Sequence, residues 1–441
     1  MLRFLATLFV MIFAGCAAHS PYNRAFVSKA LADRTGHTLA ATAKTAAASI
    51  PAGVSLADGL TADEAVALAL WTNAQFQTDL TELGFARSDL IEAGLLRNPI
   101  LSLLFPLGPK QLEASLSLPI EVLWQRPQRV AAARLEAQRV AENLVQHGLE
   151  LARDTQIAYA DLIFARAQTR IAGEHARLRQ EIADIAAARL RVGDISELEA
   201  SAAGLEALRA QAAVPGFAQE AETIRARLNT LMGVEIKDTS FALTPTQEAE
   251  LPLQTFPELA RAAFASRPDL RAAELAIEAA GKRLGWEHAK IFSFTGVLDA
   301  NGAGKEGFEI GPGAQMEIPL FHWNGGKVAR AKTQMEQAAR QYVAVKQRIA
   351  LEVNDAHTGY LAAQQALALC RSQWVPAAMA AAGRAQKTYA AGETSYLFVL
   401  EINRQLLDAR WREAEAEAGL HRASARLQHS VGFYQVKQRQ P

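Results

Sequence analysis

Histidine and cysteine are the residues of this chain that could carry bond chemistry, and both are few. The nine histidines are scattered, and His147 with Glu150 is the nearest approach to a metal-ligating pair at helical spacing. One such pair in a long helical pattern is expected by chance. The sequence also has no phosphate-binding glycine-rich loop after a strand and no nucleophile elbow. It therefore predicts no enzyme, no cofactor and no metal site.

The two cysteines predict different roles. Arg3, the apolar run at 4–13 and the small residues before Cys16 resemble a bacterial lipoprotein signal, in which the cysteine becomes the acylated first residue. Ala17 in place of an aspartate then implies sorting to the outer membrane. The alternative is an ordinary secretory signal with an incidental cysteine. Cys370 lies in a helical pattern and is expected to be a small core residue rather than a catalytic thiol.

Two stretches of the chain alternate polar and apolar residues. In residues 113–120 and, more cleanly, 308–318, apolar side chains face one way and polar ones the other, which is typical of strands with one wet face. Residues 291–298 are predicted to pair with the second stretch through a turn at 301–304. Each strand would have about ten residues, which is the length that a tilted strand needs to cross a membrane.

The wet faces of these strands carry Glu113, Glu309 and Glu317. We expect these carboxylates either to influence ion selectivity from a channel lumen or to be plain solvated groups. Four amphipathic strands cannot span a membrane alone, because an open sheet leaves unpaired edges in lipid. Closure with other copies is therefore expected, and a homotrimer would provide twelve strands from three copies of four.

The strands belong to a unit that occurs twice, with its copies about two hundred residues apart. Leu-Pro-Ile at 118–120 and Ile-Pro-Leu at 318–320 each end a strand. A long helical pattern follows each, and the first, at 126–190, would extend about 100 Å. Residues recur every seven positions along both patterns, with small residues on a second flank, as in a closed wall of helices. Gly193 and Gly392 end these helices.

The composition excludes several other classes of protein. Lys plus Arg and Asp plus Glu are equal at 46 each, so no global charge attracts nucleic acid. Half of the residues are apolar but only 7% are aromatic, which suits thin, alanine-rich helices better than a thick globular core. No linker rich in proline, glycine and serine divides the chain, so one body of two repeats is favoured.

The order of these motifs carries a family resemblance. The doubled series of helix, strand pair and two helices, the proline-containing strand exits and the stretch Tyr389-x-x-Gly392 before Leu400-Glu401 resemble the TolC family of outer-membrane efflux proteins. The resemblance covers the chain from residue 60 to about residue 433. The Ser-Leu-Pro-Ile-Glu exit at 117–121 is similar in particular to the heavy-metal branch of the CzcC and CusC type.

The resemblance implies an α+β membrane protein of the TolC-like fold. Three chains would form a twelve-stranded transmembrane β-barrel, with four strands per chain, and a long periplasmic α-helical barrel made from two internal repeats. The trimer would be the exit duct of a tripartite efflux system, fed by a periplasmic membrane-fusion adaptor and an inner-membrane pump of the RND type. It would lie in outer-membrane lipid, anchored by its acyl chains, extend into the periplasm and perform no bond chemistry.

The resemblance also assigns roles to the ends of the long helices. The turns at Gly193, Asp194, Gly392 and Glu393 would be the periplasmic tips that contact the adaptor.

In the family, acidic residues just inside the second tip narrow the entrance. The matching positions here hold Phe398 and Glu401, and Glu199 lies similarly after the first tip. Three copies of Glu401 would form a cation-attracting ring, whereas Phe398 indicates a hydrophobic constriction instead. A solvated helix face explains Glu401 equally well.

The expected organisation has six segments. These are a signal peptide (1–15), a lipidated leader (16–59), a first efflux repeat (60–232), an equatorial connector (233–256), a second efflux repeat (257–433) and a C-terminal tail (434–441). The leader is expected to be extended, and the first helix to begin at a capping box at Thr61 and continue to Arg97. The alternative function is a periplasmic coiled-coil adaptor or scaffold lipoprotein, which would explain the helices but not the strand pairs.

Overall fold

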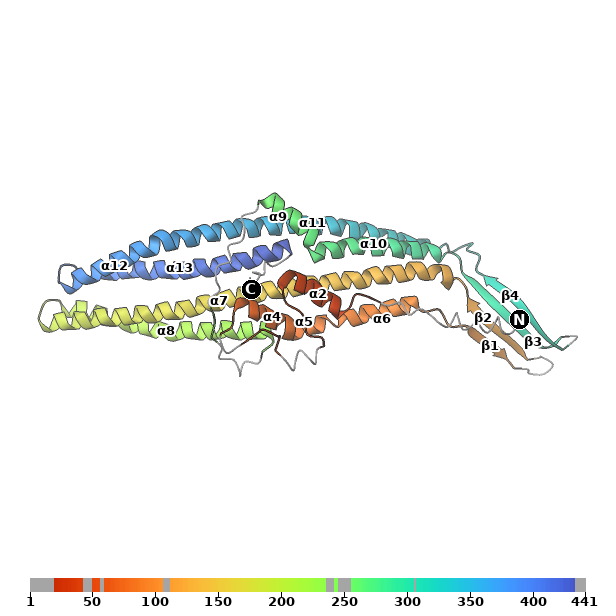
Figure 1. Ribbon diagram of the computed structural model, residues 1–441, viewed down its shortest axis with the longest axis horizontal. Coiled ribbons are helices and arrows are strands. Elements are labelled where there is room, and N and C mark those ends of the chain that lie inside the picture. The colour runs from red at the N-terminus through yellow and green to blue at the C-terminus, as the bar shows by residue number, and fades with distance from the viewer. Residues whose placement is uncertain are drawn as a thin grey trace. The chain divides into compact units, whose positions relative to one another are not determined.

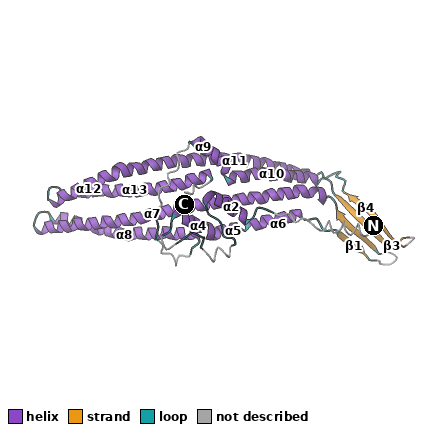
Figure 2. Cartoon of the chain, in the orientation of Figure 1, coloured by secondary structure: helices purple, strands orange, loops and turns teal. Residues whose placement is uncertain are grey.

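The structure is a computed structural model that describes residues 20–42, 50–55, 59–105, 112–234, 242–244, 255–304 and 307–432. The expected signal peptide, the acylation site Cys16 and the C-terminal tail lie outside the described residues. The described chain consists of helices and one antiparallel sheet (Figure 1, Figure 2).

The elements follow the doubled order that the sequence predicts. The first series is α2 (Arg24–Thr35), α4 (Ala62–Thr72), α5 (Ala74–Asp79), α6 (Glu82–Gly94), β1 (Ile100–Leu104), β2 (Glu113–Pro119), α7 (Val122–Arg191) and α8 (Glu197–Met232). The second series is α9 (Phe256–Ser266), α10 (Pro268–Ala289), β3 (Phe294–Gly304), β4 (Gly307–Met316), α11 (Gly325–Leu369), the π-helix η2 (Cys370–Trp374), α12 (Val375–Ala390) and α13 (Tyr396–Val431). Each series places its strand pair before its longest helix.

The chain divides into two compact units, and each takes residues from both series. The first, here called the strand unit, comprises residues 1–27, 78–146 and 267–348. The second, here called the helical unit, comprises residues 28–77, 147–266 and 349–441.

The strand unit contains a four-stranded antiparallel sheet in the order β1-β2-β3-β4. Ile100 pairs with Ser117, and Phe294 pairs with Met316. The start of β1, the end of β2, the start of β3 and the end of β4 therefore lie at one end of the sheet. All four helix connections leave from that end.

The register gives the sheet one apolar face. Leu116 lies between Leu101 and Leu298 across the sheet, and Leu298 pairs in turn with Pro312. The alternation predicted separately in the two repeats therefore produces a single continuous surface. Leu101, Leu116 and Leu298 are all exposed in the described chain.

Two details of the predicted strands are wrong. Residues 301–304 belong to β3 rather than to a turn, because Asn301 and Gly304 still pair with β4 across an irregularity in the register. β1 and β2 have five and seven residues, shorter than the ten predicted, whereas β3 and β4 have eleven and ten.

Side chains secure the helices of the strand unit. Arg129 Nε donates to the carbonyl of Ala93 over 2.7 Å and Arg126 Nε to that of Gly94 over 2.8 Å, so both cap the C-terminal end of α6. Asp269, at the start of α10, lies 2.7 Å from the buried Arg267 guanidinium and 2.9 Å from Arg348 on α11.

In the helical unit, the first predicted helix begins as expected but is broken. The Thr61 hydroxyl accepts from the Glu64 N–H over 3.2 Å, and the Glu64 carboxylate accepts from the Thr61 N–H over 2.9 Å, which confirms the capping box. The single helix to Arg97 is wrong. Asn73 ends α4, because its amide donates to the Leu231 carbonyl and its side-chain oxygen accepts from the N–H of Phe76.

The prediction of an extended leader is wrong. The leader contains α2, whose Leu31 is fully buried against Gly148 of α7. A Cβ at Gly148 would approach Leu31 to 2.8 Å, so the absence of a side chain there is what admits the leader helix. Arg34 donates to the Ser266 carbonyl over 3.2 Å at the end of α9.

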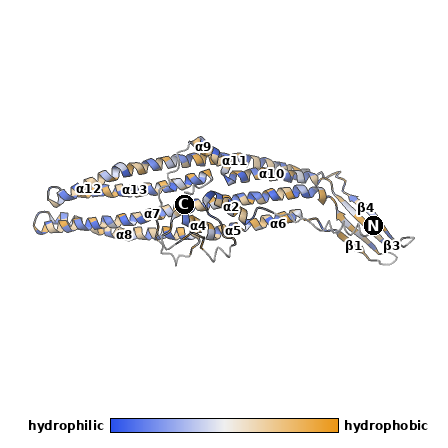
Figure 3. Ribbon diagram, viewed as in Figure 1, coloured by the Kyte–Doolittle hydropathy of each residue, from blue (hydrophilic) through white to orange (hydrophobic). Residues whose placement is uncertain are grey.

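The long helices are confirmed, with one interruption. α7 has 70 residues, whereas the second long helix changes to a π-helix at Cys370–Trp374, just before Pro376. Proline has no N–H to donate, so the regular ladder cannot pass through it unchanged. Figure 3 shows hydrophilic and hydrophobic residues mixed along these helices. No helix in the described ranges is long and apolar enough to cross a membrane.

Candidate functional site

The two candidate tips in the helical unit have the same backbone turn. Gly193 and Gly392 adopt positive φ angles of 76° and 78°. In each turn the glycine N–H donates to the carbonyl three residues back, and the following N–H, of Asp194 or Glu393, donates to the carbonyl five residues back. This is the Schellman arrangement, which favours glycine because other residues are strained at such φ angles. The repeated sequence motif is therefore also a repeated geometry.

A serine begins the helix after each turn. Ser196 precedes α8, and its hydroxyl accepts from the Glu199 N–H over 3.2 Å. Ser395 precedes α13 in the same extended conformation. Glu199 consequently lies in the first turn of α8, where a carboxylate is stabilised by the helix dipole. That position gives Glu199 a structural role whether or not it also acts at the entrance.

An apolar cluster joins the four helix ends near the tips. It comprises Ile182, Ala183 and Ala186 of α7, Ala203 and Ala207 of α8, Ala385 and Tyr389 of α12, and Tyr396 and Val399 of α13. The rings of Tyr389 and Tyr396 lie 6.4 Å apart and are almost fully buried. The small alanines allow the helices to approach closely, so the two tips of one chain pack as a single body.

Arg189 links the two tips and is not among the site residues predicted from the sequence. Its Nε lies 2.6 Å from the Asp194 carboxylate, and its guanidinium carbon lies 5.0 Å from the centre of the Tyr389 ring. The hydrogen bond that Arg189 donates to Asp194 raises the pKa of Arg189. The arginine thus pairs with its own turn and makes a cation–π contact with the other hairpin. The sequence did offer one signal for this pair, since an arginine stands five positions before an acidic residue with the glycine turn between them.

The structure places the gate candidates Phe398 and Glu401 one turn apart on α13, where both are substantially exposed. Nε and Nη2 of Arg404 each donate to the Glu401 carboxylate over 2.9 Å, and Gln405 donates to it as well. These donors, Arg404 first, lower the pKa of Glu401 to about 2. Glu401 is therefore ionised at neutral pH, but a neighbouring positive charge offsets it.

A half-buried imidazole, that of His175, lies on α7 about five helical turns before the tip. Arg179 is 4% exposed, and its Nε donates to His175 Nε2 over 3.0 Å. Burial and the Arg179 charge lower the pKa of His175 to about 4. His175 is therefore the neutral acceptor for a buried arginine, a role that no spacing in the sequence indicated.

The sheet brings two of the three predicted lumen carboxylates together. Glu113 on β2 pairs with Asn301 on β3, and Asn301 pairs with Glu309 on β4. The two glutamates therefore lie in one row on the polar face of the sheet, and both are exposed. Glu317 follows the end of β4, at the opposite end of the sheet, and does not join this row.

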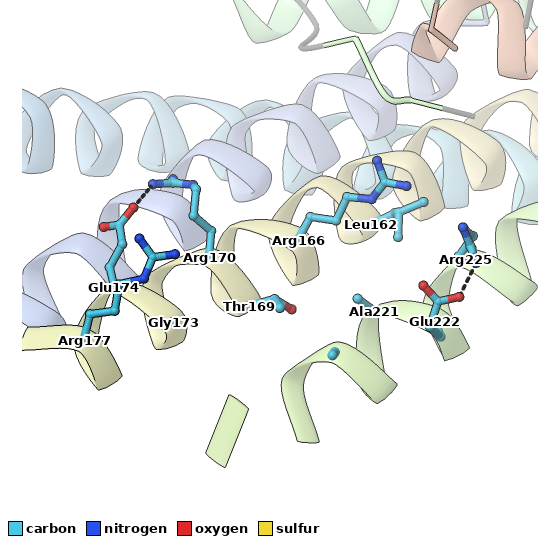
Figure 4. A pocket seen from close by; sticks show the side chains of 11 residues that line it. Leu162, Arg166, Thr169, Arg170, Gly173, Glu174, Arg177, Ala221, Glu222 and Arg225 are labelled. Carbon is cyan, nitrogen blue, oxygen red and sulfur yellow. Dashed lines mark hydrogen bonds and ion pairs between the residues drawn. The ribbon is translucent and has the colours of Figure 1, made fainter. Parts of the chain in front are cut away.

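A groove of about 600 Å³ lies between α7 and α8 in the helical unit (Figure 4). Arg166, Arg170 and Arg177 line it from one stripe of α7, and Arg225 lines it from α8. Two glutamates also line it: Glu174 lies 3.0 Å from Arg170, and Glu222 pairs with Arg225. Gly173 lines the groove together with Ala218 and Ala221 of α8, and a Cβ at Gly173 would meet no atom within 4 Å.

None of these positions brings a nucleophile, a base and an orienting group together. In the part of the chain that the structure describes, no group of three or more His, Cys, Asp or Glu residues is placed to hold a metal ion. The arrangement instead provides surfaces: a polar sheet face, helix tips and grooves between helices.

Comparison with known proteins shows what this arrangement resembles. Residues 259–433 match the family model described as outer membrane efflux protein. The cobalt-zinc-cadmium resistance protein CzcC of Cupriavidus metallidurans is 23% identical over 380 residues, which cover 85% of this chain and 90% of that protein.

Solved structures share the fold over most of the chain. The outer-membrane channel OprN matches with a TM-score of 0.73 and 21% identity, over 85% of this chain and 90% of its own. CusC matches with a TM-score of 0.72 and 19% identity, over 85% and 92%. TolC-family channels form trimers within tripartite pumps. The four-stranded sheet and the long paired helices therefore give this chain the TolC-like outer-membrane channel fold, and its second repeat matches the outer membrane efflux protein family.

Proposed function

We propose that three copies of this chain form one continuous exit duct, which receives its cargo from a periplasmic adaptor and an inner-membrane pump of the RND type. The observation that supports this most strongly is the sheet. β1 and β4 each have one edge that pairs with no other described strand, while the apolar face continues across all four strands. Strands in lipid must satisfy their edges, and three copies of four strands would do so as a twelve-stranded barrel.

A direct experiment separates this duct from the alternative of a periplasmic coiled-coil scaffold. The full-length chain, purified in detergent, is expected to have the mass of a trimer and to conduct ions after insertion into planar bilayers. A scaffold would remain soluble after removal of its lipid and would not conduct. Protein that is monomeric and soluble without detergent would end the duct proposal.

We also propose that the duct is anchored by lipid at Cys16, after removal of residues 1–15. The apolar run and the small residues before the cysteine support this assignment. Intact-mass measurement of the membrane-extracted chain is expected to show an acylated Cys16 as the first residue, and Cys16→Ser to abolish that mass. Cleavage at another position without acylation would contradict the assignment.

The proposed adaptor contacts are the exposed turns that contain Gly193, Asp194, Gly392 and Glu393. Support comes from their shared Schellman geometry, which presents the same backbone twice per chain. A trimer would then offer six near-equivalent turns to an adaptor ring. Substitution of the exposed Glu393 by a bulky residue is expected to prevent co-purification of the adaptor without changing the mass of the trimer. Undiminished co-purification of the adaptor would contradict the assignment.

The proposed resting gate consists of Phe398 and Glu401, with Glu199 of the other hairpin. Arg189 supports it, because it ties the first tip to Tyr389 of the helix that precedes α13. Arg189→Gln is expected to increase the open probability of the isolated channel in planar bilayers. Arg191→Gln, at an exposed arginine of the same turn, is the matched control and should leave it unchanged. An equal open probability in the wild type, Arg189→Gln and Arg191→Gln would show that Arg189 has no role in gating.

For the cargo we propose divalent metal cations. The name of CzcC links that relative to cobalt, zinc and cadmium resistance, and the row of Glu113 and Glu309 would present carboxylates to a cation. A strain that lacks the chain is expected to become sensitive to these metals and to recover with the wild-type gene. Unchanged metal tolerance with increased drug sensitivity would assign the duct to a drug exporter instead.

A further inference from the structure

The helix-linked end of the sheet carries large exposed apolar side chains. The register places all four strand ends there, and each end is flanked by such residues. They are Leu95 and Leu96 before β1, Leu123 and Trp124 after β2, Phe292 before β3, and Phe321 and Trp323 after β4. We call these seven residues the junction belt. Phe321 is 98% exposed, so no neighbour in the chain accounts for it.

Two exposed tryptophans lie at this junction. They are Trp124 in the first turn of α7 and Trp323 just before α11. Tryptophan and tyrosine are enriched where a protein passes from the hydrocarbon layer into water, because their rings are apolar and their N–H or O–H groups are polar. Trp124 and Trp323 therefore have the residue type and the exposure expected at such a boundary.

Basic side chains accompany the junction belt. Arg97 precedes β1, Lys290 precedes β3, and Lys327 and Arg330 lie on the exposed first turns of α11. Lys290 is engaged locally, since its Nζ lies 2.7 Å from Glu287 and 3.6 Å from the centre of the Trp286 ring. Among the described residues, neither Lys327 nor Arg330 forms a close ion pair, although the Lys327 charge helps to lower the pKa of Glu287.

Hydrogen bonds hold the junction in place. Trp124 Nε1 donates to the Ala289 carbonyl over 3.3 Å, which joins the start of α7 to the end of α10. Asn324, at a positive φ of 55°, donates from Nδ2 to the Glu287 carbonyl over 2.7 Å, which joins the start of α11 to α10. The exposed rings and the exposed Lys327 and Arg330 therefore extend from a fixed framework.

We propose that the junction belt, with Lys327 and Arg330, binds the headgroups of anionic glycerophospholipids in the periplasmic leaflet of the outer membrane. This inference rests on the proposed position of the sheet in that membrane. The apolar face of the sheet leads directly into the belt, so whatever covers the face also reaches the belt. In the proposed ring, neighbouring copies meet along the edge strands β1 and β4, whereas a lipid leaflet also reaches the ends of β2 and β3.

Charge complementarity selects the headgroup. A lysine or arginine near an anionic lipid surface stabilises binding by about 1 kcal/mol, which is about fivefold, and zwitterionic headgroups lack that attraction. The guanidinium of Arg330 can donate two parallel hydrogen bonds to a phosphodiester, and Lys327 supplies a point charge.

The test measures which lipid the full-length trimer retains. The protein is equilibrated with equal amounts of phosphatidylglycerol and phosphatidylcholine in detergent, and the lipids that remain bound are counted by native mass spectrometry. Wild-type protein is expected to retain phosphatidylglycerol preferentially. The double variant Lys327→Gln and Arg330→Gln is expected to reduce that preference at least about fivefold.

A matched control removes the same two charges elsewhere. Arg384 and Lys387 are an exposed arginine and lysine three positions apart on α12, and Arg384→Gln with Lys387→Gln should leave the lipid preference unchanged. Equal retention of both lipids by wild-type protein, or an equal loss in both double variants, would overturn the inference. A preference for lipid A over phosphatidylglycerol would also overturn it, since it would assign the belt to the outer leaflet.

The outcome for the proposed function can be read separately. A chain that inserts into vesicles of phosphatidylcholine and conducts ions, but shows no preference for phosphatidylglycerol, would keep the duct and lose the lipid site. A chain that inserts into neither vesicle would lose both.

Discussion

Glu401 shows how a neighbour can change the role expected of a single residue. The sequence indicated a ring of three carboxylates that attracts cations. The structure adds two hydrogen bonds from Arg404 and one from Gln405, which lower the carboxylate pKa to about 2. A carboxyl group with a depressed pKa keeps its charge until the pH falls through that value. The pair therefore keeps the same charge across the physiological range, and the proposed gate should not respond to pH through Glu401.

Glu401→Gln is expected to make the entrance less cation-selective. The substitution removes the negative charge and leaves Arg404 uncompensated, so three positive charges would face the proposed entrance. The reversal potential of single channels in a salt gradient measures this shift. Glu336→Gln is the control, because Glu336 is also exposed and paired with an arginine, Arg340, but lies on α11 in the strand unit. An unchanged reversal potential in Glu401→Gln would place the gate elsewhere.

His175 is expected to make the helical unit sensitive to acid. Its pKa is about 4 in the folded chain, below the ordinary value of 6.5, because burial and Arg179 disfavour the imidazolium. The unfolded chain binds the extra proton first, so folded-state stability present above pH 6.5 is lost as the pH falls toward 4. The loss between pH 8 and pH 5 would be about 2 kcal/mol per chain.

Urea unfolding of wild-type and His175→Gln protein at the two pH values measures this effect. Glutamine keeps an acceptor for Arg179 but cannot titrate, so the variant should lose less stability than the wild type over the same pH range. His357→Gln, at a partly exposed histidine of α11, is the control. An identical pH dependence in wild type and His175→Gln would refute the assignment.

At the scale of elements, the tip turns should depend on glycine more than the helices do. Gly392→Ala forces a side chain into φ 78° and is expected to destabilise the α12–α13 hairpin by about 1 kcal/mol. Gly419→Ala is the matched substitution inside α13, where the new Cβ meets nothing within 4 Å. It is expected to stabilise by about 0.5–1 kcal/mol, because alanine is the better helix former. Thermal denaturation of the two variants should therefore shift in opposite directions.

The long elements could be predicted from sequence because their periodicity repeats many times. Alternation over 113–120 and 308–318 located β2 and β4, and heptad spacing located α7 and the second long helix. The breaks could not be predicted, because each depends on a contact distant in the chain. α4 ends at Asn73 because its amide reaches Leu231, and α2 forms where Leu31 can pack on Gly148.

The site residues likewise divide into those that could be predicted from the sequence and those that could not. The glycines of the two tips were visible in the sequence, since the same turn occurs twice and glycine tolerates its φ. The partners of Arg189, His175 and Glu401 were not, because side-chain hydrogen bonds across a turn or along one helix face leave no periodic signal. The shared row of Glu113 and Glu309 likewise needed the sheet register.

At the scale of the whole molecule, the family fold and the open sheet edges lead to one central claim. Each chain supplies four strands, and β1 of one copy would pair with β4 of the next until three copies close. The polar face of every strand would then line a single lumen, while the apolar face meets lipid. The proposed gate, the adaptor turns and the lipid site at the junction belt all depend on this ring.

Cysteine cross-linking between the outer strands tests that claim most directly. In a Cys370→Ala background, Ser102→Cys on β1 is combined in turn with Glu309→Cys, Gly311→Cys and Gly313→Cys on β4, and the detergent-purified protein is oxidised. The control pairs Ser115→Cys with Asp299→Cys, which face each other on β2 and β3 within one chain and should raise no mass.

At least one β1–β4 combination is expected to give a covalent species of three chains that resists denaturation in sodium dodecyl sulfate and is resolved by reductant. Only single chains in every combination, with the β2–β3 control disulfide formed, would contradict the ring.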